Sequence, residues 1–291
     1  MKKISKATII CLFLTSCSNS DGKVAKSKLT GYDYRLFQDT PAWPLAKAVR
    51  DKDTSEVKTL VIENKIDPDY QESRCGNTLL MMSIFNNNYA SAKILLDVGA
   101  DPNLRDRCSG ATAVINAAEN KDSKYLKLLL AYKGNPKVGE NKSVKDNDSP
   151  MQTALTSAIS YYYANSLEKV TLLIEAGADV NYPNNNSNTD LPLGIAIKRD
   201  KIDVALYFLE NGADYKKVIY KLIDGHDVYI LEALRKNLLD LQSPEYNKKL
   251  AVIAFLKGKG LDYYKEHIPD YVLKAIKMKY PKTWEEYAQK Y

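Results

Sequence analysis

The chain has 291 residues, of which 45% are apolar, so it is long enough to bury a large core or to extend as a repeat protein. Its 42 basic residues exceed its 36 acidic ones by six, and three of these lysines precede residue 17, which leaves 39 against 36 in the rest of the chain. Such a small excess does not indicate a nucleic-acid-binding protein, which usually presents a clearly basic face.

The first 16 residues have the anatomy of a secretion signal peptide. Lys2, Lys3 and Lys6 precede a short apolar run over residues 7–14, and small residues follow it. The run cannot cross a bilayer, because a spanning helix needs about 20 apolar residues. The alternative, a fragment of a core helix, does not explain the lysines in front of the run. We therefore predict a cleaved signal peptide at residues 1–16.

The segment "LTSC", residues 14–17, resembles the end of a bacterial lipoprotein signal, with an aliphatic residue, two small residues and a cysteine. The resemblance implies that Cys17 is lipidated and becomes the first mature residue. It also implies that Ser18, in place of an aspartate, directs the protein to the periplasmic side of the outer membrane. Several acyl chains are needed for stable anchoring. We expect residues 17–36 to form the lipidated cysteine and a flexible, Lys- and Ser-rich spacer.

A short motif then recurs along the chain. The segment "ILLDVGADPN" at residues 94–103 returns as "LLIEAGADVN" at 172–181 and as "YFLENGADY" at 207–215. In each copy a glycine follows an apolar run, as expected where a helix ends in the left-handed conformation. Upstream of the copies, Thr78, Thr112 and Thr153 are suited to cap a partner helix. These threonines are 34 and 41 residues apart, a period that predicts a solenoid of helical pairs.

These features together resemble the ankyrin repeat, G-x-T-P-L-H-x-A-A…L-L-x-x-G-A-D, over residues 41–215 as five units, with a looser sixth at 222–237. The resemblance implies an all-α ankyrin-repeat solenoid of about five to six helical-pair units. We place the array at residues 37–237 and a helical C-terminal cap at 238–291, since a solenoid needs a terminal unit that closes its core. An unrelated array of helical hairpins is the alternative. The chain departs from the family at the histidine position of the motif, which is occupied by Met81, Ile115, Thr156 and Gly194.

Two cysteines remain in the predicted mature chain besides the lipidated one. Cys75 and Cys108 are 33 residues apart, about one repeat period. The ankyrin alignment puts both on the fingers that lead into the first helix of neighbouring units, so they could reach disulfide distance. The alternative is a pair of free thiols, which an oxidising compartment disfavours. Our hypothesis is that the two cysteines are bonded.

The sequence shows no catalytic constellation. Its two histidines, His226 and His267, lack the spacing of a metal motif, and neither a nucleophile elbow nor a phosphate-binding loop is present. We therefore predict that the protein is not an enzyme and that it needs no cofactor or metal.

What remains is binding to another protein. Ankyrin arrays bind partners with a concave surface built from the fingers and the first helices. The resemblance maps this surface onto one set of positions. We add three consecutive tyrosines, of which at least one should be exposed, the alternative being that two pack in the core and the third is incidental. Arg105 and Arg107 form a second candidate patch, whose alternative is a pair of solvated side chains. The predicted partner-binding residues are Arg74, Asn77, Phe85, Asn86, Arg105, Arg107, Glu119, Asn120, Tyr161, Tyr162, Tyr163, Lys198 and Arg199.

Lipid-anchored periplasmic ankyrin proteins resemble immunity proteins of interbacterial toxin systems, some of which guard against phospholipase effectors of type VI secretion. We therefore expect a toxin or effector enzyme as the partner, with contact to the membrane through the lipid anchor only and none to nucleic acid. The first alternative is an envelope scaffold or an accessory protein for a resident periplasmic enzyme. The second is an enzyme whose site is assembled from distant residues.

Overall fold

The computed structural model describes residues 21–140, 152–159, 162–163, 165–182 and 190–291. Within these ranges it contains fourteen α-helices, three short 3₁₀ helices and one two-stranded hairpin. The 3₁₀ helices are η1 (Lys26–Lys28), η2 (Tyr34–Phe37) and η3 (Tyr263–Lys265), and the strands are β1 (Tyr220–Lys221) and β2 (Asp227–Val228). The α-helices are α1 (Trp43–Asp51), α2 (Thr54–Ile62), α3 (Leu79–Phe85), α4 (Tyr89–Asp97), α5 (Ala113–Glu119), α6 (Lys124–Ala131), α7 (Ala154–Ala158), α8 (Ser166–Glu175), α9 (Pro192–Lys198), α10 (Ile202–Glu210), α11 (Ile230–Lys236), α12 (Pro244–Gly258), α13 (Asp270–Lys279) and α14 (Trp284–Lys290).

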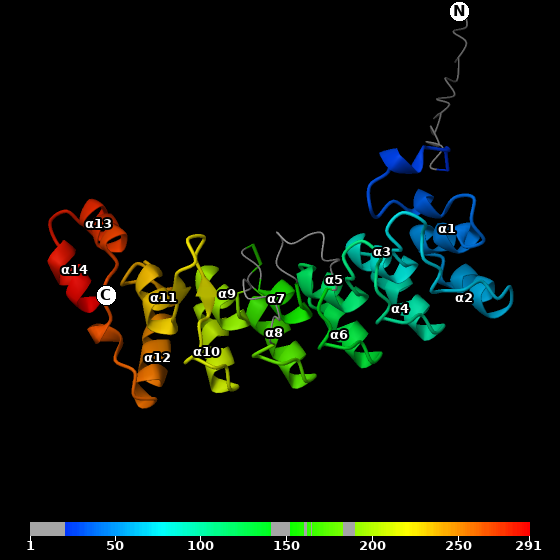
Figure 1. Ribbon diagram of the computed structural model, residues 1–291. Coiled ribbons are helices and arrows are strands. Elements are labelled where there is room, and N and C mark those ends of the chain that lie inside the picture. The colour runs from blue at the N-terminus through cyan, green and yellow to red at the C-terminus, as the bar shows by residue number, and fades with distance from the viewer. Residues whose placement is uncertain (1–20, 141–151, 160–161, 164, 183–189) are drawn as a thin grey trace, which may run out of the picture.

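The helices stack as successive pairs in a long, curved array (Figure 1). The odd-numbered helices α1 to α11 form one row and the even-numbered helices α2 to α12 form the other. Each helix packs on its neighbours in the same row, as α5 does on α3 and α7. The prediction of an all-α solenoid of helical pairs is therefore confirmed. Because α12 continues the row of α10, the sixth unit extends into the region predicted as the cap, and α13 and α14 form the end of the chain.

The predicted helix caps explain why each pair begins where it does. The hydroxyl groups of Thr78, Thr112 and Thr153 accept the backbone N–H groups of the residues three positions later. This satisfies one of the donors that a helix start leaves unpaired. At the other end of a pair, Gly99 and Gly177 have φ values of 102° and 97°, which favour glycine.

Gly194 shows why the fifth unit lacks the motif's histidine. A Cβ atom at this position would lie 2.3 Å from the backbone oxygen of Ile219. Ile219 directly precedes β1, and its oxygen also accepts the backbone N–H of Leu191 at 2.9 Å. The hairpin β1–β2, which pairs Tyr220 with Val228, therefore packs directly on α9. The sequence analysis did not predict this hairpin.

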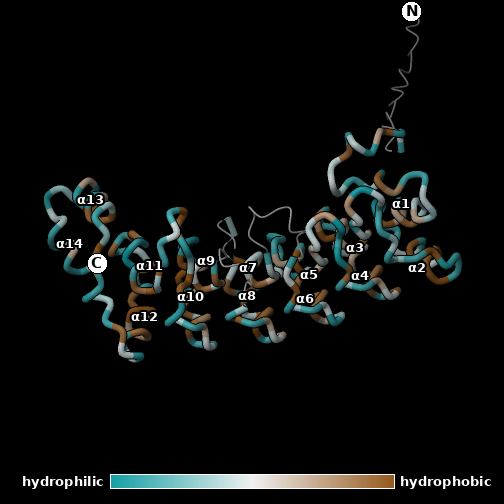
Figure 2. The backbone as a smooth tube through the Cα atoms, viewed as in Figure 1, coloured by the Kyte–Doolittle hydropathy of each residue, from teal (hydrophilic) through white to brown (hydrophobic). Residues whose placement is uncertain are grey.

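One hydrophobic core runs from the first unit to Tyr263, and a second, smaller cluster joins α13 and α14 to the start of α12. Figure 2 shows hydrophobic residues along the helices where neighbouring pairs meet, and hydrophilic residues in the turns. This distribution fits a solenoid in which each unit buries its apolar face against the next. No helix in the described ranges is long and apolar enough to span a membrane.

Residues 21–42 form a segment that we call the N-terminal strap. Leu36 and Phe37 are fully buried against the first unit. The side chain of Gln38 donates to the backbone oxygen of Asp21 at 2.8 Å, and Arg50 pairs with the Asp21 carboxylate at 2.6 Å. The flexible spacer expected over residues 17–36 is thus held by side-chain contacts from Asp21 onward, and its apolar side chains are buried from Leu29 onward. The predicted signal peptide and the predicted lipidation site Cys17 lie outside the described residues.

Candidate functional site: a hollow on the concave face

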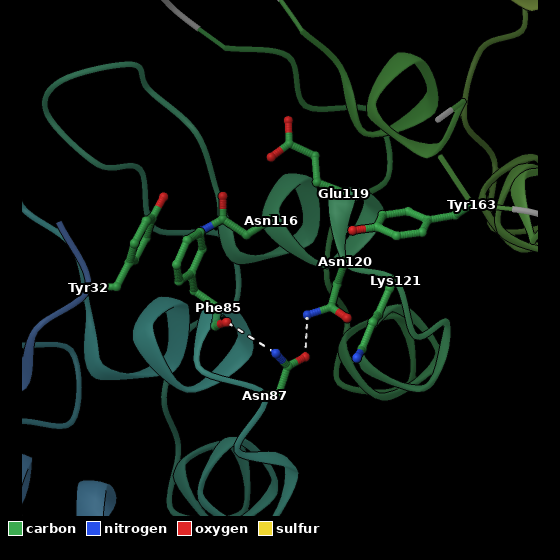
Figure 3. Close-up of a pocket in the computed structure, with 8 residues that line it drawn as sticks. All are labelled: Tyr32, Phe85, Asn87, Asn116, Glu119, Asn120, Lys121 and Tyr163. Atoms are coloured by element: carbon green, nitrogen blue, oxygen red, sulfur yellow. Dashed lines mark hydrogen bonds between the residues drawn. The ribbon is translucent and has the colours of Figure 1, made fainter. Parts of the chain in front are cut away.

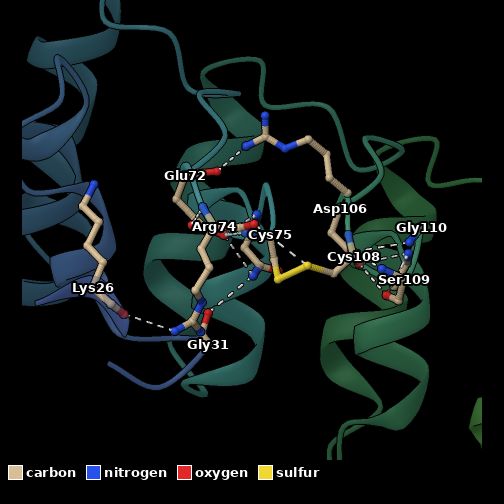
Figure 4. Close-up of a disulfide and its surroundings, with 12 residues drawn as sticks. Lys26, Gly31, Glu72, Arg74, Cys75, Asp106, Cys108, Ser109 and Gly110 are labelled. Carbon is tan, nitrogen blue, oxygen red and sulfur yellow. Dashed lines mark hydrogen bonds between the residues drawn. A yellow bond between two sulfur atoms is a disulfide. The ribbon is translucent and has the colours of Figure 1, made fainter. Parts of the chain in front are cut away.

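The strap occupies the first part of the concave face, on the side of α1 and α3 (Figures 1 and 4). Arg74 donates to the backbone oxygen of Leu29 at 2.7 Å and to that of Lys26 at 3.3 Å. Asn86 donates to the backbone oxygen of Tyr32 at 2.9 Å. The buried Asn77 likewise donates to the oxygen of Gly31 at 3.4 Å. Three of the predicted partner-binding side chains therefore hold the protein's own strap.

Two fingers are linked by the disulfide between Cys75 and Cys108, whose Cα atoms are 5.1 Å apart (Figure 4). The predicted bond is thus present in the structure. Around it, the backbone N–H of Arg107 donates to the oxygen of Cys75, and its guanidinium donates to the oxygen of Glu72. Arg105 bridges the next finger by donating to the oxygens of Gly110 and Gly139. Both arginines, predicted as a partner patch, bind carbonyl groups within the array.

A hollow of about 310 Å³ opens on the concave face beyond the strap. The ring of Tyr32, from the strap, stacks on Phe85 of α3, with ring planes 13° apart and centres 3.3 Å apart. Tyr163 faces this pair from the opposite side (Figure 3). Residues of α5 and of the turn after it lie between the two walls. The lining residues are Tyr32, Phe85, Asn87, Asn116, Glu119, Asn120, Lys121 and Tyr163.

Glu119 is the one carboxylate among these lining residues. Its side chain is accessible to solvent, yet the concave surface surrounds it with protein, and this loss of solvation raises its pKa. Repulsion from Glu140 raises the pKa further. The carboxylate accepts one long hydrogen bond, 3.4 Å, from the hydroxyl of Ser157. The site therefore stabilises the negative charge of Glu119 less well than water does.

A buried lysine lies near this carboxylate. Lys169 of α8 is fully buried, and its ammonium group donates to the backbone oxygens of Ala118 at 2.6 Å and Asn120 at 3.1 Å. These carbonyl groups belong to the C-terminal end of α5, where a cation is favourable. Burial lowers the pKa of Lys169 to about 8. The positive charge of Lys169 acts to lower the pKa of Glu119. Desolvation and the charge of Glu140 outweigh this attraction, so the pKa of Glu119 is raised overall.

The protein family described as ankyrin repeats (3 copies) matches residues 45–142 and, in a second alignment, residues 98–184. Residues 45–184 therefore carry ankyrin repeats. A solved structure of an ankyrin repeat protein, EF0377, aligns with 72% of this chain and 96% of its own length, at a TM-score of 0.50 and 23% identity. At this identity the likeness bears on the fold alone.

Two curated proteins are similar to part of this chain. The transient receptor potential channel pyrexia of Drosophila melanogaster is 34% identical over 125 residues, which are 43% of this chain and only 12% of the channel. Protein PhlB of Serratia liquefaciens is 27% identical over 198 residues, which are 68% of this chain and 81% of PhlB.

The remaining predicted partner-binding residues in the described part of the chain do not line the hollow. Lys198 pairs with Asp190 at 2.6 Å, and Arg199 donates to the oxygen of Ile159, so both hold neighbouring segments together. Tyr162 is 90% exposed, whereas Tyr161 lies outside the described residues.

Four predicted positions, Phe85, Glu119, Asn120 and Tyr163, do meet in the hollow. Sequence reasoning missed Tyr32, which lies in the segment taken as a spacer. The apolar residues of "GYDYRLF", residues 31–37, are the signal that it should pack. Within the described part of the chain, no three His, Cys, Asp or Glu side chains converge as a metal site would require. The matching family is that of ankyrin repeats, and an ankyrin array is typically a non-enzymatic binding scaffold.

Proposed function

We propose that the protein is a lipid-anchored, periplasm-facing immunity protein that binds and blocks an interbacterial toxin, such as a type VI phospholipase effector. The ankyrin array carries the coarser part of this proposal, since ankyrin repeats are protein–protein interaction modules. The finer part rests on the lipoprotein-like start of the sequence and on the site.

The observation that carries the proposal is a set of three exposed aromatic side chains, two of which line the hollow while the third is the sequence neighbour of one of them. Phe85 is 53% exposed, Tyr162 is 90% exposed and Tyr163 is 37% exposed. Large aromatic side chains are costly to leave in water and are favoured anchors of protein interfaces. Since the hollow lies between two of these side chains, a protruding element of a partner can enter it.

The disulfide supports the proposed compartment. Cys75 and Cys108 are joined in the structure, and disulfides persist in oxidising surroundings such as the periplasm. The bacterial protein PhlB aligns with this chain over 81% of its own length, which supports a bacterial setting for the proposal.

The proposed mechanism is occlusion. A toxin bound along the concave face would have its active site or its membrane-docking surface covered, without any reaction by the ankyrin protein. A lipid tether at Cys17 would keep the inhibitor at the membrane where a lipase attacks, and would thereby raise its local concentration.

Capture from the producing strain tests this proposal. The purified protein is immobilised, exposed to secreted and envelope fractions, and the retained proteins are identified by mass spectrometry. We expect one stoichiometric toxin-like enzyme, whose activity falls when the two are mixed. We also expect a Phe85→Ala, Tyr162→Ala double variant to release it, whereas a variant of the exposed Tyr271, far along the chain in α13, should not.

A resident envelope enzyme retained in place of a toxin would favour the accessory-protein alternative. Retention of an enzyme whose activity is unaffected would contradict the occlusion mechanism.

A further inference from the structure

The hollow combines flat aromatic walls with a negative charge. One wall is the stacked pair Tyr32 and Phe85, and Phe85 is the member more than half exposed. Tyr163 forms the facing wall, and the Glu119 carboxylate lies between the walls at the edge of α5 (Figure 3). Aromatic faces attract cations, and a carboxylate pairs with them.

Among the described residues, the hydrogen bonds of the two cations near Glu119, Lys169 and Arg199, go to backbone oxygens and not to its carboxylate. Lys169 gives its hydrogen bonds to the oxygens of Ala118 and Asn120, at the end of α5. Arg199 donates to backbone oxygens at the end of α7. Lys121 lines the hollow on the side of Asn87, and Figure 3 shows Glu119 on the other side.

The acceptor groups in the hollow differ in what they already bind. The side-chain oxygen of Asn87 accepts the amide of Asn120 at 3.1 Å, so this pair is engaged. Among the described residues, no hydrogen bond is made by the side chain of Asn116, which also lines the hollow. Its amide oxygen therefore offers a second acceptor beside the Glu119 carboxylate.

We propose that this hollow receives an arginine side chain presented by a protein partner, with its guanidinium paired to Glu119 and stacked on Phe85. The inference rests on the proposed function in so far as the partner is a protein. Arginine fits better than lysine because its planar guanidinium both stacks on an aromatic face and donates two parallel hydrogen bonds to a carboxylate. Binding would also bring a positive charge into direct contact with the Glu119 carboxylate, which accepts the long hydrogen bond from Ser157.

A matched pair of peptides tests the site without knowledge of the partner. The probes are the pentapeptides Gly-Ser-Arg-Ser-Gly and its citrulline counterpart, which has nearly the same shape but no charge. Binding to the purified, ¹⁵N-labelled protein is followed by NMR. We expect the arginine peptide to shift the amide signals of Phe85, Glu119 and Tyr163, and to bind at least about tenfold more tightly than the citrulline peptide.

Variants separate a specific site from general attraction. Glu119→Gln should reduce binding of the arginine peptide to the level of the citrulline peptide. Glu175→Gln, which changes an exposed glutamate at the end of α8, should leave the preference intact. Equal binding of the two peptides to the wild-type protein, or an unchanged preference in Glu119→Gln, would overturn the proposal. Thermal melting of each variant shows that the fold is retained.

The captured partner supplies the second readout. If the wild-type protein retains a partner, Glu119→Gln should weaken that complex by about tenfold or more. An unchanged affinity would refute recognition through this hollow while the proposed function stands. If the wild-type protein retains nothing, the proposed function fails, and the peptide comparison still decides whether the hollow binds arginine.

Discussion

Lys249 makes the stability of the C-terminal region depend on pH. This α12 side chain is fully buried, its ammonium group donates to the backbone oxygen of Asn237 at 2.9 Å, and it lies 3.7 Å from the centre of the Tyr291 ring. Burial, and then repulsion from Arg235, lower its pKa to about 6. In the unfolded chain a lysine has a pKa of about 10.4.

The sign of the pH dependence follows from these two values. Between pH 6 and pH 10 the unfolded chain binds a proton at Lys249 that the folded chain does not bind, so stability increases with pH and is lost as pH falls toward 6. Each pH unit in this window changes the free energy of unfolding by about 1.4 kcal/mol. Allowing for partial protonation of the folded form near pH 6, the free energy of unfolding should increase by about 2 kcal/mol from pH 6 to pH 8.

Lys249→Met isolates this contribution. Methionine retains most of the side-chain length without a titrating group, and the hydroxyl of Tyr291 still donates to the oxygen of Asn237. The variant lacks the gain of about 2 kcal/mol that Lys249 gives the wild type between pH 6 and pH 8. The free energy of unfolding of the variant, minus that of the wild type, should therefore be about 2 kcal/mol larger at pH 6 than at pH 8. Other groups that titrate in this range are present in both proteins, so their effects cancel.

The two tryptophans allow this region to be followed separately. Trp43 lies in the first unit and Trp284 lies in α14. In a Trp43→Phe background, urea unfolding at pH 6, 7 and 8 is monitored through the fluorescence of Trp284. Lys257→Met changes an exposed lysine in the same helix and is the matched control. A stability difference between Lys249→Met and the wild type that is the same at all three pH values would refute the reasoning.

Two further predictions concern the covalent bond and the backbone. Replacing Cys75 and Cys108 together by serine should lower the free energy of unfolding by about 3–4 kcal/mol, because the bond closes a 33-residue loop in the unfolded chain. Urea unfolding measures this, and thiol titration of the denatured, unreduced protein should find no thiol at either cysteine. Gly194→Ala should destabilise by at least about 1–3 kcal/mol, because the new Cβ meets the backbone of Ile219. Gly258→Ala, in a helix with open space around it, should instead stabilise by about 0.5–1 kcal/mol. Equal effects of the two alanines in thermal melts would contradict this account.

The repeat architecture could be predicted because its signals are local. Thr78 and Thr112 cap helices through their own side chains, and Gly99 ends one through its own φ angle. Each of these features depends on a few neighbouring residues, so it recurs visibly at the repeat period. The disulfide could be inferred as well, since the repeat period fixes which fingers lie side by side.

The site was harder to predict because it depends on contacts between distant segments. Arg74 and Arg107 occupy positions that the ankyrin surface usually exposes, yet each donates to carbonyl groups of this chain. Tyr32 lies more than 50 positions before Phe85, on which it stacks, and no periodic pattern connects the two. Such pairings are decided by three-dimensional packing, which the repeat pattern does not encode.

The composite origin of the hollow also bears on how this array can change during evolution. Repeat proteins often gain or lose whole units, because each unit contacts only its neighbours. Here the strap, α3, α5 and the segment before α8 each contribute lining residues, so loss of the third unit would remove Glu119 and change the spacing between Phe85 and Tyr163. We therefore expect related proteins that use the same hollow to keep the number of units between the strap and α8 constant, and to vary in length beyond α8.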